Sequence, residues 1–204
     1  MRFGTRATAV KIFASVVLVG GAAAVAALGT YGSFTSTTSA SDTVSTGKVV
    51  MNSTNGVRAL SVDATNLVPG DTVERTVTLS RSNDTESFGS VKLTTTATSS
   101  NVLTSDATNG LQLKVDTCPA AWTKPANSNA LNCSGSVTNV VSQRAVLGQN
   151  IDLAAVNTAL NAAGATSNLR VTLTLPASAD NAFQGLSNTI NFVFDGTQRA
   201  AEAR

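Results

Sequence analysis

Two stretches in the last third of the chain alternate strictly between apolar and polar residues. One covers residues 169–175 and the other residues 190–194. A two-residue period is typical of a β-strand with one buried face. Because such a face needs an opposing apolar layer, these stretches predict sheets that pack against each other. The apolar positions are Leu169, Val171, Leu173, Leu175, Ile190, Phe192 and Phe194.

Weaker versions of the same pattern recur upstream. Clusters of turn residues lie between the apolar runs, including one that ends in Asn55-Gly56 and another at Pro69-Gly70. Counting all the runs gives about eight strands, so we expect an all-β fold, an antiparallel β-sandwich of the jelly-roll type. The further strands are predicted at 47–51, 57–64, 72–80, 88–97, 111–115 and within 136–147, with turns at 52–56 and 66–71.

One segment, residues 150–164, has a helical period instead. Its apolar residues are spaced by three and four positions, Asn150 can act as N-cap and Gly164 can end the helix. We therefore expect one short crossover helix, packed on the edge or end of the sandwich. The predicted buried stripe is Leu153, Val156, Leu160 and Ala163.

The N-terminal segment, residues 1–33, resembles a secretory signal peptide. Three basic residues precede residues 12–28, which carry no charge. Small residues permit cleavage within 22–27 or later, between Ser33 and Phe34. The alternative is an uncleaved membrane anchor, because the apolar run is near the lower limit for spanning a bilayer. The absence of a positive stop-transfer cluster favours cleavage.

Removal of residues 1–33 leaves 171 residues, enough for one domain. Three of the fourteen basic residues are lost with the segment, so eleven remain against twelve acidic ones. This balance gives no electrostatic footprint for nucleic acid or an anionic membrane. The sequence contains no His, which excludes Ser-His-Asp and Cys-His catalysis and HExxH zinc sites.

The chain has two cysteines, Cys118 and Cys133. In an exported protein this pair is best read as a disulfide, whereas a redox pair favours CxxC spacing and a metal site needs more ligands. The only Trp, Trp122, lies in the loop between them, where we expect it to pack down as hydrophobic mass.

The remaining domain organisation follows from composition. Residues 34–46 form a polar arm, rich in Ser and Thr, with little apolar surface to bring it back onto a core. We expect it to be flexible, followed by a jelly-roll domain at 47–198 and a loose tail at 199–204. The tail has no second apolar segment or LPxTG signal, so we expect no C-terminal anchor.

Three blocks and the end of the signal segment resemble the TasA and camelysin (CalY) family of secreted biofilm-matrix proteins. The signal end, 29–34, is similar to SipW-dependent signal peptides, which are cut just before a Phe. The blocks are residues 34–50, residues 67–73 with the following strand, and residues 175–198, and together they cover most of the chain after residue 33.

The resemblance implies a jelly-roll subunit of extracellular fibres, in which the N-terminal arm of one subunit completes the sheet of its neighbour. The donor would be residues 34–46, with Phe34 and Val44 as anchors. An open sheet edge offers unpaired backbone groups that an extended peptide can satisfy. Part of the family carries a metalloprotease annotation, but this sequence shows no catalytic, cofactor-binding or metal-ligating constellation. Residues Asp180, Asn181 and Gln184 offer oxygens to calcium without EF-hand spacing, and a hydrogen-bonded turn is the better interpretation.

The leading hypothesis is thus a secreted structural protein of a bacterial extracellular matrix or cell surface, which is not an enzyme, needs no cofactor and associates with itself. The alternative is a monomeric, surface-associated binding or adhesion module with the same fold. A camelysin-like protease is the third hypothesis.

Overall fold

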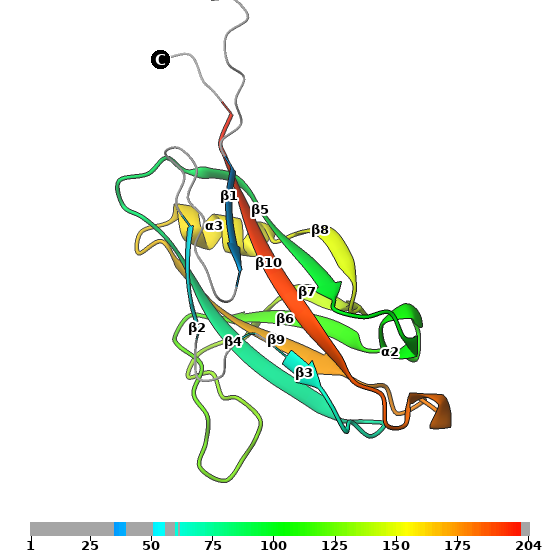
Figure 1. Cartoon of the computed structure of the whole chain (residues 1–204). Coiled ribbons are helices and arrows are strands. Elements are labelled where there is room, and N and C mark those ends of the chain that lie inside the picture. Colours follow the sequence, from blue (N-terminus) through cyan, green and yellow to red (C-terminus); the bar gives the residue numbers. More distant parts are fainter. Residues whose placement is uncertain (1–34, 40–50, 56–59, 61, 201–204) are drawn as a thin grey trace, which may run out of the picture. The chain divides into compact units, whose positions relative to one another are not determined.

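A computed structural model of the chain describes residues 35–39, 51–55, 60 and 62–200. Two five-stranded antiparallel sheets pack face to face (Figure 1). The strands are β1 (Thr35–Ser39), β2 (Met51–Asn55), β3 (Val62–Ala64), β4 (Thr72–Arg81), β5 (Phe88–Ala97), β6 (Gln112–Cys118), β7 (Thr138–Ala145), β8 (Gly148–Asp152), β9 (Thr166–Thr174) and β10 (Asn188–Gln198). The helices are α2 (Val102–Ser105), α3 (Ala154–Asn161) and the short 3-10 helix η1 (Asn181–Phe183).

The strand order confirms the predicted all-β sandwich and has the connectivity of a jelly roll. One sheet runs β1-β10-β5-β8, with β3 also paired to β10, and the other runs β2-β4-β9-β6-β7. From β3 to β10 the chain passes between the two sheets at every connection except β6 to β7. The eight strands β3 to β10 therefore form the jelly roll, while β1 and β2 each add one edge strand.

The core lies between the two sheets, where the alternating stretches place their apolar side chains. In β9, Leu169, Val171 and Leu173 are fully buried, and in β10 the side chains of Ile190 and Phe194 are fully buried too. The opposite positions of both strands are polar or partly exposed. Burial on one face only is what the two-residue period predicts, and each sheet provides the apolar layer that the other needs.

The connections gather at two ends of the sandwich. The α2 end carries the loops 65–71, 98–111, 146–147 and 175–187, and the α3 end carries the loops 82–87, 119–137 and 162–165 together with the chain after β10. At the α2 end, the predicted Pro69-Gly70 turn is present. Gly70 has a φ of 95°, which favours glycine, and the Asp71 carboxylate accepts a hydrogen bond from the Val68 N–H at 2.9 Å.

The helix is shorter than predicted. It covers Ala154–Asn161 instead of 150–164, because β8 extends to Asp152 and pairs with β5. Asn150, expected as the N-cap, lies in β8. Leu153, Val156 and Leu160 are fully buried as expected, but Ala163 is exposed beyond the helix end.

The prediction of a turn at residues 52–56 was wrong for 52–55, which form most of β2. These residues pair with the edge of β4, from Met51 opposite Arg81 to Asn55 opposite Val77. Hydrogen bonding to an open strand edge outweighs the turn preference of Asn and Ser, because β-propensity depends strongly on context. The strand expected at 57–64 is limited to β3 in the described residues, and residues 47–50 lie outside them.

Arg199 was assigned to the loose tail, but its guanidinium forms an ion pair with Glu86 at 3.0 Å and its N–H bonds to the Ser87 carbonyl. Across the described part of the chain, no helix has the length and apolar character required to cross a membrane.

We predict that Leu173→Ala lowers the free energy of unfolding by about 2–5 kcal/mol, because it leaves a cavity between the sheets. Thr172→Ala, the neighbouring change on the outer face, should cost less than about 1 kcal/mol. Urea unfolding of both variants checks this. Equal losses would contradict the assignment of the two faces.

Candidate functional site

The long strand β10 has two edges that are covered in different ways. Along one edge, β5 pairs with it from Ile190 to Gln198. The other edge is covered by two separate short strands: β3 pairs with Asn188–Ile190, and β1 pairs with residues 193–197. Most of the second edge therefore depends on a strand from the N-terminal arm.

Strand β1 is held by its backbone in a regular antiparallel register. Thr35 lies opposite Thr197 and Ser39 lies opposite Val193, and no bulge interrupts the five residue pairs. The β1 sequence contains only Thr and Ser, so it brings no apolar anchor. Each backbone hydrogen bond contributes about 0.5–1.5 kcal/mol net, which explains why a polar segment can form this strand.

This pairing differs from our expectation that the arm has little reason to fold back. That expectation considered side-chain burial alone and ignored the unpaired N–H and C=O groups of an open edge. The predicted cleavage position at Ser33 and Phe34, and the predicted anchors Phe34 and Val44, lie outside the described residues. Their roles stay predictions.

The opposite edges of the two sheets are irregular. Strand β7 pairs with β6 through two register shifts, and β8 pairs with β5 through another. Bulges of this kind make an edge strand a poor template for a further strand. The regular edge of β10, occupied by β1, is therefore the better candidate for accepting a strand.

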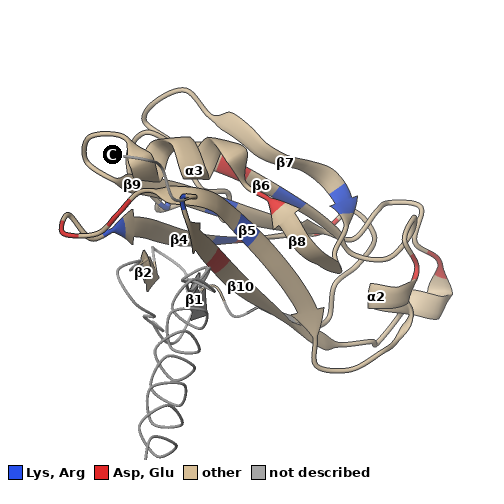
Figure 2. Cartoon of the chain, turned by 90° about the horizontal axis from the view of Figure 1, so that it is seen from above, with Lys and Arg blue, Asp and Glu red and all other residues tan. Residues whose placement is uncertain are grey.

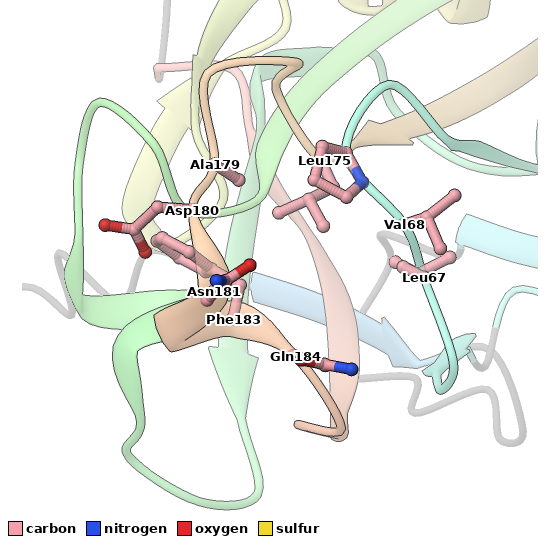
Figure 3. A pocket seen from close by; sticks show the side chains of 9 residues that line it. Leu67, Val68, Leu175, Ala179, Asp180, Asn181, Phe183 and Gln184 are labelled. Atoms are coloured by element: carbon pink, nitrogen blue, oxygen red, sulfur yellow. The ribbon is translucent and has the colours of Figure 1, made fainter.

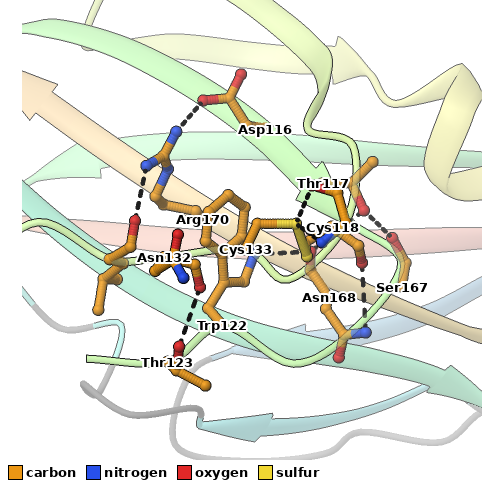
Figure 4. The surroundings of a disulfide bond; sticks show 12 residues. Asp116, Thr117, Cys118, Trp122, Thr123, Asn132, Cys133, Ser167, Asn168 and Arg170 are labelled. Atoms are coloured by element: carbon orange, nitrogen blue, oxygen red, sulfur yellow. Dashed lines mark hydrogen bonds and ion pairs between the residues drawn. A yellow bond between two sulfur atoms is a disulfide. The ribbon is translucent and has the colours of Figure 1, made fainter. Parts of the chain in front are cut away.

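The predicted disulfide is present between Cys118 and Cys133 (Figure 4). It closes the loop between β6 and β7 over the outer face of the β4-β9-β6 sheet. Trp122 packs down in this loop as expected, with only 4% of its surface exposed, and its indole N–H donates to the Asn168 carbonyl at 3.0 Å. The loop is thus fastened to β9 by a hydrogen bond as well as to its own ends by the disulfide.

Beneath the loop, Arg170 of β9 binds two carboxylates. Its guanidinium contacts Glu74 at 3.1 Å and Asp116 at 2.9 Å, and it lies 4.3 Å from the centre of the Trp122 ring. Glu74 also accepts a hydrogen bond from the backbone N–H of Leu131. The network therefore joins the disulfide loop to β4, β9 and β6, and Figure 4 shows its ion pair between Arg170 and Asp116.

The side chain of Asp116 is only 1% exposed. Burial raises the pKa of its carboxyl group, but hydrogen bonds from Asn139, Arg170 and Lys114 and the charge of Lys114 together outweigh burial. The pKa consequently lies below the ordinary value of 3.8. Asp116 is therefore ionised in the folded protein at neutral pH.

A small pocket of about 230 Å³ opens at the α2 end (Figure 3). Its walls are mainly apolar and come from the loop before β4 and the loop before β10. Asp180, which lines it, accepts a hydrogen bond from the Ala182 N–H at 2.9 Å and so caps η1. The interpretation of Asp180 and Asn181 as a hydrogen-bonded turn agrees with this geometry.

Comparison with protein families gives one result that decides the assignment. A family model described as camelysin metallo-endopeptidase matches residues 9–203. The chain belongs to the camelysin family. No curated protein and no solved structure gave a match. Membership of the camelysin and TasA family supports an extracellular, matrix-associated protein.

The camelysin family name implies a metal ion, which needs several donor side chains placed around one point. Within the described residues, no group of three or more His, Cys, Asp or Glu side chains is placed to hold a metal. Glu74 and Asp116 both form ion pairs with Arg170. Both cysteines form the disulfide. The described residues do not fit a catalytic metal centre.

Sequence reasoning missed two features of the camelysin-family chain. The Arg170 network joins residues up to 96 positions apart, and alternation cannot show which strands are neighbours. The one available signal was charge: Glu74 and Arg170 interrupt strands that are rich in Thr, and Asp116 is the acidic residue of β6. Pairing of β1 with β10 had no side-chain signal.

We predict that Asp116→Asn lowers the free energy of unfolding at pH 7 by about 1–3 kcal/mol, because it removes the charge that satisfies Arg170. A depressed pKa means that Asp116 stabilises the fold above pH ~4 and loses this effect as the pH falls through its folded-state pKa. The difference between wild type and variant should therefore narrow in acid. Urea unfolding at pH 7, 5 and 3 measures it, with the exposed Asp84→Asn as control. A difference that does not change with pH would contradict the account.

Proposed function

We propose that this protein is a secreted structural subunit of a bacterial extracellular matrix, which assembles into fibres by exchanging strand β1 between copies. The observation that carries the proposal is the pairing of β1 with β10 through backbone groups, in a regular register and without apolar anchors. An edge that accepts this segment from its own chain offers the same hydrogen bonds to the identical segment of another chain.

Exchange keeps every β1–β10 contact and changes only which chain provides it. The strand order supports the role of β1 as a separable part, because the jelly roll from β3 to β10 is complete without it. Withdrawal of β1 exposes one edge of β10 and leaves the packed faces in place. The residues between Ser39 and Met51 connect β1 to the domain, and their number sets how far the exchanged strand reaches.

Secretion fits the same proposal. The signal segment 1–33 would place the chain outside the cytoplasm and cleavage before Phe34 would free the arm. A disulfide is typical of proteins in oxidising surroundings.

The second candidate, a monomeric binding or adhesion module, is favoured by the apolar pocket at the α2 end. In that case β1 would stay on its own β10 at all concentrations. Sedimentation velocity over a wide range of protein concentrations separates the two candidates, because strand exchange requires association.

We predict that residues 34–204 form fibres and that residues 47–204, which lack the arm, stay monomeric at the same concentration. Negative-stain electron microscopy of both purified proteins makes the comparison. Fibres from the shorter protein would show that β1 is not the assembly device. Monomers from both would favour the binding module.

A second prediction tests whether backbone hydrogen bonds hold β1 on β10. Neighbouring residues of a strand point their N–H groups in opposite directions, so Thr37→Pro with Thr38→Pro must remove one N–H that faces β10. We expect this variant to form no fibres. The matched control, Thr37→Ala with Thr38→Ala, keeps both N–H groups and should assemble like the wild type. Loss of assembly in both variants would instead assign the contact to side chains.

The role proposed here is structural and not catalytic. We expect purified protein with added Zn²⁺ to hydrolyse an unstructured peptide substrate no faster than buffer with Zn²⁺ alone. Mass spectrometry of the substrate detects cleavage. Hydrolysis by the wild type that is lost in Asp180→Asn would show that the chain is a peptidase.

A further inference from the structure

The α2 end of the domain carries an apolar surface that the chain itself leaves open. Leu67, Val68 and Pro69 form one wall of the 230 Å³ pocket, Leu175 lies beside this wall, and Phe183 lies opposite (Figure 3). Val68 is 59% exposed, the highest value among the large hydrophobic side chains of the described residues. Burial of such a side chain against a partner removes apolar surface from water, which is favourable.

A second pocket of about 230 Å³ opens at the same end. It lies between the loop after β5 and the turn before β8, where Leu147 is 38% exposed. The pocket walls here are mostly Ser and Thr. Two hollows and two of the three exposed large apolar side chains of the described residues therefore lie at the α2 end, and the third, Val137, lies in the disulfide loop at the α3 end.

Charge limits what can bind there. The α2-end loops carry Asp71, Asp106 and Asp180 and no Lys or Arg, and Arg144 is the second-last residue of β7, which ends there. Red segments of the ribbon lie beside α2 in Figure 2. Two α2 ends would repel each other. The α3-end loops carry charges of both signs. Asp84 and Glu86 are acidic, Lys124 and Arg199 are basic, and Glu86 forms an ion pair with Arg199.

The direction of β1 decides which surfaces meet during exchange. Since β1 runs antiparallel to β10, the donated strand leaves the acceptor at Ser39, pointing toward the α2 end of the acceptor. The same donor chain resumes at Met51, which lies opposite Arg81 at the α3 end of the donor. The chain between these points thus leads from one copy's α2 end to the other copy's α3 end.

The length of the connection keeps these ends close. Twelve Cα steps separate Ser39 from Met51, which span roughly 40 Å when fully extended. Ser39 of the donated strand and Met51 of the donor domain therefore lie no more than about 40 Å apart, which keeps the two copies close.

From these observations we infer that the apolar surface around Val68 docks against the α3 end of a second copy of this chain. This inference rests on the proposed strand exchange and gives it a second, side-chain contact. At the α3 end, Ala162 and Ala163 are exposed in the loop after α3 and present a small apolar surface. The contact orients successive subunits head to tail, and the acidic α2 end disfavours the head-to-head arrangement.

The first test adds a charge to the contact without touching the arm. Val68→Asp, made in the full-length chain and purified after processing by the host, should raise the protein concentration needed for fibre assembly by about tenfold or more, equivalent to about 1.4 kcal/mol. Gln143→Asp is the matched control, because it adds the same charge at an exposed position of β7. Thermal unfolding confirms that both variants are folded. Equal assembly of the two variants would overturn the contact.

The second test identifies the partner surface. Val68→Cys and Ala163→Cys chains are mixed, assembled and treated with a short bismaleimide cross-linker. We expect links between the two variants and none in either variant alone. Links between two Val68→Cys chains, or no links within fibres, would overturn the head-to-tail contact while strand exchange stands. If wild-type protein forms no fibres at all, strand exchange and this inference both fail.

Discussion

The backbone of β10 needs hydrogen-bonding partners along both of its edges, and the way this need is met determines much of the structure. The edge toward β5 is covered continuously, while the other edge is shared by β3 and β1. Because β1 contains only Thr and Ser, its position depends on the N–H and C=O groups of β10. A strand held in this way can be replaced by an identical strand from another molecule with no loss of contacts.

Unlike β1, the disulfide loop is held by a covalent bond and by side-chain contacts. It is fixed by the Cys118–Cys133 bond, by the Trp122 hydrogen bond to β9 and by the hydrogen bonds of Leu131 to Glu74 and Arg170. These contacts involve three strands of the β2-β4-β9-β6-β7 sheet. The disulfide loop is therefore the firmly held part of the domain, and β1 is the part that can exchange between copies. The two lie on different sheets.

Much of the fold could be predicted from the sequence because it depends on side-chain burial. The period-two pattern of β9 and β10, the exact range of β5 and the Pro69-Gly70 turn all have local signals. Predictions failed where backbone pairing decides the outcome. Residues 52–55 form β2 on the edge of β4 in spite of their turn composition, and Asn150 joins β8 instead of capping a helix.

The candidate site could be predicted only where side chains determine it. The disulfide and the packing of Trp122 follow from spacing and hydrophobicity, whereas the position of β1 on β10 has no signal in the side chains of either strand. Membership of the camelysin family covers almost the whole chain, and the described residues nevertheless lack a donor set for the metal that the family name implies. The structural role proposed above requires no such donor set.

The most direct test of the account is to determine which chain supplies β1. Thr37 lies opposite Asp195, so Thr37→Cys and Asp195→Cys place two thiols on the same face of a paired strand. In chains carrying both changes and one of two distinguishable tags, mass spectrometry identifies whether the resulting disulfide joins one chain or two. The account predicts links within one chain in dilute monomer and links between differently tagged chains in fibres. Links confined to single chains within fibres would contradict strand exchange.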